Sequence, residues 1–271
     1  MLLISFLFLT GTYFYDSIYA MLALFKSHYS IGKSILTLDD PITHKEGGSD
    51  SVFTIAKENN LETVVLVEDS LTGFLQAKKI SEKYGINLAF GLRINMKENA
   101  GEDPKQEASS SSHKIIIFAK TSKGCKILNN IYSEAFSKNF NSVDEKILKK
   151  LWKKRDLELA IPFYDSFIFN NTMKFSNCTP SFSFTDPYFI TESNGLPFDA
   201  MLEERVKNYA RDKQKIIKAK SIYYKNKEDV KALQTYKCIC GRTFGNKTLS
   251  KPNLDHFGSD QFSFESWKEK K

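Results

Sequence analysis

The chain alternates between short apolar runs, which suit strands, and longer segments with helical periodicity. Residues 64–67 form a β-branched apolar run with the composition of a strand that is buried on both faces. From Phe74 to Tyr84 apolar residues recur at helical spacing, and Gly85 is a helix stop. A second apolar run, residues 86–90, follows. This order predicts a βαβ unit and hence a parallel sheet, with polar loops at the carboxyl ends of its strands.

The same alternation continues on both sides of this unit. Further strands are expected at residues 22–26, 113–119, 157–163 and 216–224. Helices are expected at residues 50–59, 127–136, 143–155, 198–211 and 227–238. Ser49 and Asp50 are candidate caps of the first helix, and Arg93 is expected to end the second strand of the βαβ unit. Residues 97–112 are rich in Ser, Glu and Lys and predict a mobile surface loop, whereas residues 164–195 give no clear assignment.

The two ends of the chain are expected to differ from the part between them. An apolar run at residues 2–9 has no Lys or Arg before it and is shorter than the roughly 20 residues of a membrane span. Residues 1–20 are therefore expected to lie outside the core, as an extra strand or an upstream extension, with a cleaved export signal as the alternative. The tail from Gly241 is expected to be mostly irregular. No membrane partner is expected.

Cysteine spacing and charge limit the classes of function. Cys238 and Cys240 are separated by one residue, which is too close for a CxxC metal site, and no second pair exists. A reduced, cytoplasmic protein is expected. The net charge of +7 is compatible with nucleic acid without demanding it. A solvated helix face is the simpler interpretation of the densest basic cluster, and contact with nucleic-acid phosphates is the alternative. That cluster comprises Lys146, Lys149, Lys150, Lys153, Lys154 and Arg155.

Several motifs, in one order, resemble a known family. The loop Lys26-Ser27-His28-Tyr29-Ser30 follows the first strand, and Leu66-Val67-Glu68 runs into a loop that closes with Leu71-Thr72-Gly73. Segments 91–93, 113–136, 219–239 and 257–262 continue the series. Together they resemble the N-terminal PHP (polymerase and histidinol phosphatase) domain of the bacterial DNA polymerase III alpha subunit, from about Leu22 to Trp267. The resemblance implies a distorted (βα)7 barrel over residues 21–240, with residues 241–271 similar to the exit toward the polymerase body.

The positions where this family holds two or three metal ions carry other residues here. Leu22 and Lys26 stand in place of two histidines, Val67 and Glu68 in place of an Asp-His pair, and Arg93 in place of a bridging Glu. Ser221 and Tyr223 replace the late Asp and His, and His28 lies in the first loop. Cations at metal positions disfavour metal binding. We therefore expect no cofactor and no phosphoesterase activity; the alternative is a rearranged zinc or manganese site built from His28, Glu68, Asp69 and other carboxylates.

The resemblance implies a module of a DNA-directed DNA polymerase that acts in DNA replication. The 271 residues do not include the polymerase palm and fingers, so a split or truncated subunit that serves as a structural platform is expected. Its partners would be the palm and fingers chain or the remainder of the alpha subunit, a proofreading exonuclease, or DNA. The alternatives are an active metal-dependent PHP-type phosphoesterase or exonuclease, and an exported binding protein that reuses the barrel.

Two smaller hypotheses concern individual side chains. Glu68 and Asp69 are expected either to form ion pairs with Lys26 and Arg93, as a salt-bridged plug at neighbouring strand ends, or to be solvated loop charges. The isolated residues His28 and His113 are expected to form ordinary hydrogen bonds rather than to bind metal.

Overall fold

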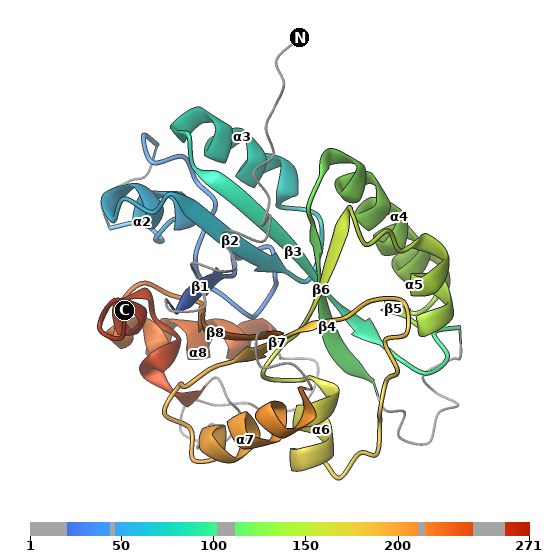
Figure 1. Ribbon diagram of the computed structural model, residues 1–271. Coiled ribbons are helices and arrows are strands. Elements are labelled where there is room, and N and C mark those ends of the chain that lie inside the picture. Colours follow the sequence, from blue (N-terminus) through green and yellow to red (C-terminus); the bar gives the residue numbers. More distant parts are fainter. Residues whose placement is uncertain (1–20, 44–46, 102–111, 211–214, 241–257) are drawn as a thin grey trace. The chain divides into compact units, whose positions relative to one another are not determined.

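The computed structural model describes residues 21–43, 47–101, 112–210, 215–240 and 258–271 (Figure 1). Residues 1–20 and 241–257, for which expectations were stated above, lie outside the described residues. The described strands are hydrogen-bonded in the order β2-β1-β8-β7-β6-β4-β3-β5, and β2 also pairs with β3, so that seven of them close a barrel. This confirms an α/β barrel. The strands are β1 (Leu22–Phe25), β2 (Thr63–Glu68), β3 (Asn87–Met96), β4 (His113–Ala119), β5 (Ser142–Val143), β6 (Leu157–Ile161), β7 (Tyr188–Thr191) and β8 (Ile216–Ile222).

One strand, β4, makes the sheet mixed rather than parallel. β1 is parallel to β2 and β8, and β6 is parallel to β7. However, β4 is antiparallel to both β3 and β6, so the expectation of a wholly parallel sheet is wrong. The sequence between β3 and β4 has no helical periodicity, and an antiparallel neighbour needs no crossover helix. β3 also continues to Met96; Arg93 therefore lies inside the strand, and the expectation that it ends the strand is wrong.

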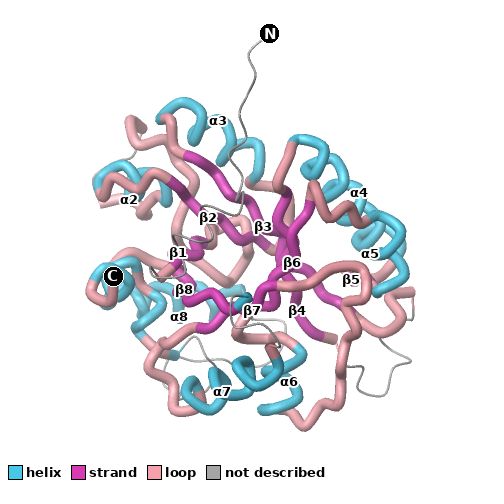
Figure 2. Tube along the Cα trace, viewed as in Figure 1, coloured by secondary structure: helices cyan, strands magenta, loops and turns pink. Residues whose placement is uncertain are grey.

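The chain divides into two compact units. The central unit contains Gly91–Thr191 and Ala200–Ile217, and the terminal unit contains Ala20–Phe90, Glu192–Asp199 and Lys218–Lys271. In the terminal unit, α2 (Val52–Glu58) packs against β2 and against α3 (Phe74–Tyr84) (Figure 2). Ser51, rather than Ser49 or Asp50, caps α2 and accepts a hydrogen bond from the Phe53 amide at 3.2 Å. α3 ends as expected at Gly85, whose φ of 66° is left-handed.

The end of the chain also belongs to the core of the terminal unit. A 3-10 turn (Lys227–Asp229) leads into α8 (Val230–Cys240). A further 3-10 turn (Asp260–Phe262) and α9 (Phe264–Lys268) follow the segment that is not described. The side chains of Phe262, Phe264 and Trp267 are buried, and the Trp267 indole donates a 2.8 Å hydrogen bond to the Met21 carbonyl. The expectation of an irregular tail is therefore wrong for residues 260–268, because an aromatic cluster holds them.

In the central unit, α4 (Ser122–Lys138) and α5 (Glu145–Leu151) pack against each other, and α4 packs against β4 (Figure 2). The helix expected at residues 143–155 is shorter. β5 precedes it, and Trp152 turns the backbone into an extended conformation because its ring packs on Phe184, with centroids 5.0 Å apart. Lys153–Arg155 therefore lie in a turn and not on the helix.

Two other segments of the central unit depart from expectation. Residues 97–101 belong to the predicted mobile loop, but Lys97 and Ala100 are buried, and the Ala100 amide donates to the Asp144 carboxylate at 3.3 Å. Residues 102–111 lie outside the described part. The unassigned stretch 164–195 forms α6 (Phe167–Met173) and β7. The helix expected at residues 198–211 is present as α7 (Asp199–Tyr209). No helix in the described ranges is both long and apolar enough to cross a membrane.

Candidate functional site

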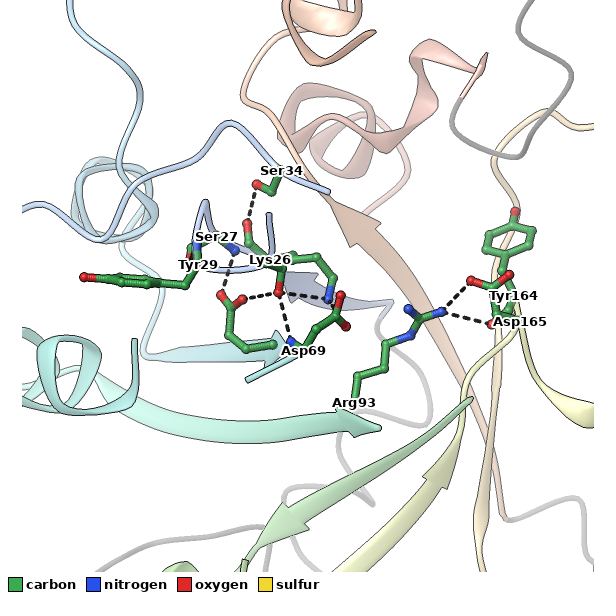
Figure 3. A network of polar contacts seen from close by, with 10 residues as sticks. Lys26, Ser27, Tyr29, Ser34, Asp69, Arg93, Tyr164 and Asp165 are labelled. Carbon is green, nitrogen blue, oxygen red and sulfur yellow. Dashed lines mark hydrogen bonds and ion pairs between the residues drawn. The ribbon is translucent and has the colours of Figure 1, made fainter. Parts of the chain in front are cut away.

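The carboxyl ends of β1 and β2 carry a buried ion pair. In the register of these parallel strands Phe25 lies opposite Leu66, so the residues that follow them lie at the same edge. Lys26 comes directly after β1 and is only 4% exposed. Its ammonium group lies 3.0 Å from the Asp69 carboxylate, and Figure 3 shows the two side chains facing each other. The predicted pairing of Lys26 with Asp69 is confirmed, and the alternative of solvated loop charges is wrong for this pair.

Glu68, the last residue of β2, is fully buried beside this pair. Its carboxylate accepts hydrogen bonds from the Ser27 amide, at 2.7 Å, and from the Ser30 hydroxyl. The Ser30 oxygen in turn accepts from Lys26 Nζ at 3.4 Å and from the Asp69 amide at 2.9 Å. Burial raises the pKa of Glu68, and the charge of Lys26 and the hydrogen bonds from Ser27 and Ser30 oppose that rise. Ser30 thus links the Glu68 carboxylate to the Lys26 ammonium group and to the Asp69 backbone amide.

The loop after β1 is fixed to the barrel by its backbone. The Lys26 amide donates to the Ile222 carbonyl at 3.1 Å, and the Ser34 hydroxyl lies 2.5 Å from the Lys26 carbonyl and 2.9 Å from that of Tyr223. Gly73 closes the loop after β2 against the Tyr29 ring, since a Cβ there would lie 2.6 Å from Cδ2 of Tyr29. These contacts hold the ion pair in one position.

A shallow pocket of about 450 Å³ lies above this network. It is lined by residues 28–31 from the loop after β1 and by Asp69, Ser70 and Thr72 from the loop after β2. His28 is half-buried and lies against the Tyr29 ring, with centroids 4.3 Å apart. Its Nδ1 atom is buried and has no hydrogen-bond partner among the described residues. The hydrogen-bonding role expected of this side chain is not seen.

A second buried carboxylate was not identified from the sequence. Glu192 directly follows β7 and accepts hydrogen bonds from the amide and hydroxyl of Ser221 on β8, at 2.8 and 2.9 Å. The side-chain amide of Asn194 donates to it at 3.0 Å. Burial raises the pKa of Glu192. A short apolar strand followed by Glu is a recognisable signal, but the aromatic residues around β7 obscured it.

Lys220 is a second cation that sequence reasoning missed. It lies on β8 with no exposed surface, and its ammonium group donates to the Ser193 carbonyl at 3.4 Å. Lys270 donates to the same carbonyl at 3.1 Å. Burial, and then the nearby charge of Lys270, lower the pKa of Lys220 to about 8. The terminal unit therefore contains two buried groups of acids and cations at its strand ends.

Three other positions that correspond to metal ligands in the resembling family lie in the sheet or in the apolar core. Leu22 pairs with Ala219 in the sheet, and Val67 is buried in β2. Tyr223 is 7% exposed and stacks on Phe262, with centroids 5.2 Å apart. None of these three side chains is a typical metal ligand.

Arg93 and His113 belong to the central unit. The Arg93 guanidinium lies 2.8 Å from the Asp165 carboxylate and 3.4 Å from the Tyr164 carbonyl (Figure 3). Sequence reasoning missed Asp165, although it follows closely after β6. His113 is buried, and its Nδ1 lies 3.6 Å from the Cys178 sulfur. This contact confirms a hydrogen-bonding role for His113.

The residues at the β1 and β2 ends do not fit the zinc or manganese site considered above. Both oxygens of Glu68 accept protein hydrogen bonds, and Asp69 is paired with a cation. Within the described ranges, no group of three His, Cys, Asp or Glu side chains lies close enough to hold a metal ion. Comparison of the sequence with protein-family models and with curated proteins gives no match.

Glu192 yields a test of stability against pH. A folded carboxyl whose pKa is raised retains its proton above the ordinary value of 4.5, so wild-type stability should fall as pH rises through the window above 4.5. Glu192→Gln cannot ionise and can keep the hydrogen bonds to Ser221 and Asn194. We expect thermal denaturation to show Glu192→Gln close to wild type at low pH and more stable at alkaline pH, by about 1.4 kcal/mol per unit of pKa shift. An equal difference at both pH values would contradict the raised pKa.

Proposed function

We propose that this chain is a PHP-like module of a replicative DNA polymerase, and that it acts as a structural platform rather than as a phosphoesterase. The observation that carries the proposal is the buried contact of Lys26 with Asp69, at 3.0 Å, with Glu68 held beside it. A metal-dependent phosphoesterase needs anionic ligands with an open coordination position for an activated water molecule. A fixed ammonium group at that place repels a metal ion and uses the carboxylate that would bind it.

The polymerase context is supported by the ordered motifs in the sequence, and the barrel supports it at the level of architecture. Fold alone does not specify function. The platform role therefore depends on the motif order and on the side chains that replace the ligands. The partner expected for such a platform is the chain that carries the polymerase palm and fingers.

Metal titration tests the inactive site. Isothermal titration of the full chain with Zn²⁺ or Mn²⁺ should give no saturable 1:1 binding, and the chain should hydrolyse neither p-nitrophenyl phosphate nor the 3′ end of single-stranded DNA. Stoichiometric metal binding that is lost in Asp69→Asn, together with hydrolysis, would overturn the proposal and favour the phosphoesterase.

Co-expression with the palm and fingers chain of the same genome tests the platform role. We expect the two chains to elute together in size-exclusion chromatography. Ile31, 75% exposed at the edge of the pocket near His28, provides a surface variant, Ile31→Asp, against the matched variant Ile42→Asp on another loop. Failure of the two wild-type chains to associate at micromolar concentration would contradict the polymerase context.

A further inference from the structure

The exposed cations around α5 form one surface on which only Lys149 has an acidic partner among the described residues. Between residues 146 and 155 the sequence has six cations and no Asp or Glu. All six side chains are exposed. We call these residues the basic surface: Lys146, Lys149, Lys150, Lys153, Lys154 and Arg155.

Local structure places these cations side by side. Lys146, Lys149 and Lys150 have the i, i+3 and i+4 spacing of one helix face. Leu148 lies on the opposite face and is fully buried. The other three cations follow the carboxyl end of α5, where the negative end of the helix dipole favours positive charge.

The turn that carries Lys153–Arg155 is held in place. The Lys120 ammonium donates to the Lys154 carbonyl at 2.6 Å, and the Lys120 amide donates to the Asp156 carbonyl at 2.8 Å. The Leu157 amide donates to the Lys153 carbonyl at 2.9 Å. A fixed backbone reduces the ordering cost when these side chains bind a ligand.

The acidic side chains that border the basic surface form hydrogen bonds or ion pairs with other side chains. Glu145 accepts from the hydroxyls of Ser181 and Ser183, at 2.6 and 2.8 Å, and is 3.3 Å from Lys149. Asp156 accepts from the Thr121 hydroxyl at 2.6 Å, and Glu158 pairs with Lys120 at 3.1 Å. In the described part of the chain, no carboxylate forms an ion pair with the other five cations of the basic surface.

Three lysines on other helices have a different environment. Lys78, Lys138 and Lys207 each form an i,i±4 ion pair with a Glu on the same helix. Such alternation of sign is typical of a solvated helix face. The basic surface departs from it, since only Lys149 has a partner of this kind.

We propose that the basic surface binds the phosphate backbone of nucleic acid. Closely spaced cations without acidic neighbours neutralise successive phosphates and release counterions. An anionic membrane is less suited, because no large apolar side chain is exposed between Glu145 and Arg155 to enter the lipid. The inference rests on the central unit alone and is independent of the proposed platform role.

Fluorescence anisotropy of the full chain with labelled DNA tests the proposal. Binding to single-stranded and duplex probes of ~20 nucleotides is measured between about 50 and 200 mM salt. The triple variant Lys146→Gln/Lys150→Gln/Lys153→Gln should lose at least about tenfold in affinity, and its salt slope on duplex should fall by about 0.9 per lost phosphate contact. The two probes distinguish a single strand from a duplex as the source of the phosphates.

The matched control removes the same charge elsewhere, in Lys78→Gln/Lys138→Gln/Lys207→Gln. We expect less than about a twofold change for this control, because exposed paired lysines contribute little. Equal losses in the two triple variants would overturn a localised site, and so would the absence of wild-type binding. Flotation with phosphatidylserine vesicles gives the other outcome: vesicle binding that requires the basic surface, without DNA binding, would replace the proposal with a membrane contact. Melting curves of both variants verify the fold.

Discussion

Lys26→Met should lower the free energy of unfolding by about 3 kcal/mol, because it removes one partner of a buried ion pair. Lys26 is 4% exposed, and its ammonium group is the positive charge that contacts Asp69 and opposes the raised pKa of Glu68. Methionine has a similar length and fills the same volume, so the loss reports the charge rather than a cavity. Thermal denaturation should show a melting temperature lower by roughly 6–12 °C.

The pH dependence of this variant has a definite sign. Without the cation, the pKa of Glu68 rises further above its ordinary value of 4.5. The folded state then holds a proton that the unfolded state has lost, so the variant should become less stable as pH rises through that window. The difference between wild type and Lys26→Met should therefore be smaller at pH 4.5 than at neutral pH.

Glu68→Gln is the second variant of a double-mutant cycle with Lys26→Met. Glutamine can still accept from the Ser27 amide, and in the double variant, where Lys26 no longer donates to Ser30, its side-chain amide can donate to the Ser30 oxygen. Lys26→Met should be milder in this background, with a coupling energy of about 1 kcal/mol or more in the double-mutant cycle. Additive effects would mean that Lys26 acts only through Asp69, and an effect of Lys26→Met below about 0.5 kcal/mol would contradict the buried pair altogether.

The sequence was sufficient to predict Lys26 with Asp69 because both follow strands that were recognisable from their apolar runs. Adjacent parallel strands bring their carboxyl ends to one edge, so two charges close to those ends have to meet. The position of Arg93 was predicted less well, since β3 continues to Met96 and places Arg93 in mid-strand rather than at the strand end. Its partner Asp165 lies 72 positions away, in a stretch whose aromatic residues show neither a helical nor an alternating period.

Glu192 and Lys220 show a second limit of predicting burial from the periodicity of the sequence. Lys220 sits inside an apolar strand, where a lysine normally indicates the solvent face, yet it has no exposed surface. Only the tertiary structure shows that the Lys220 side chain is covered. Helix ends were also misjudged where packing decides them: α5 has the expected apolar spacing up to Leu151, but burial of Trp152 against Phe184 ends it early.

Gly124→Ala should destabilise the central unit by about 2–3 kcal/mol through overpacking. Gly124 is buried in the first turn of α4, and a Cβ at this position would lie 2.2 Å from the Asp156 carbonyl oxygen and 3.1 Å from its carbon. Both are backbone atoms, and the same carbonyl accepts a hydrogen bond from the Lys120 amide at 2.8 Å. Neither side can therefore move away cheaply.

Intrinsic helix propensity predicts the opposite sign, because alanine is favoured over glycine by about 1 kcal/mol in a helix interior. The contact is expected to dominate, and the melting temperature should fall by roughly 4–12 °C. Gly101→Ala is the matched control, since among the described residues the nearest atom to a Cβ there is the Asn139 side-chain oxygen, at 3.7 Å. A stabilised Gly124→Ala would show that the turn after α5 can move. This outcome would also contradict the fixed backbone that positions Lys153–Arg155, because residue 156 belongs to the same turn.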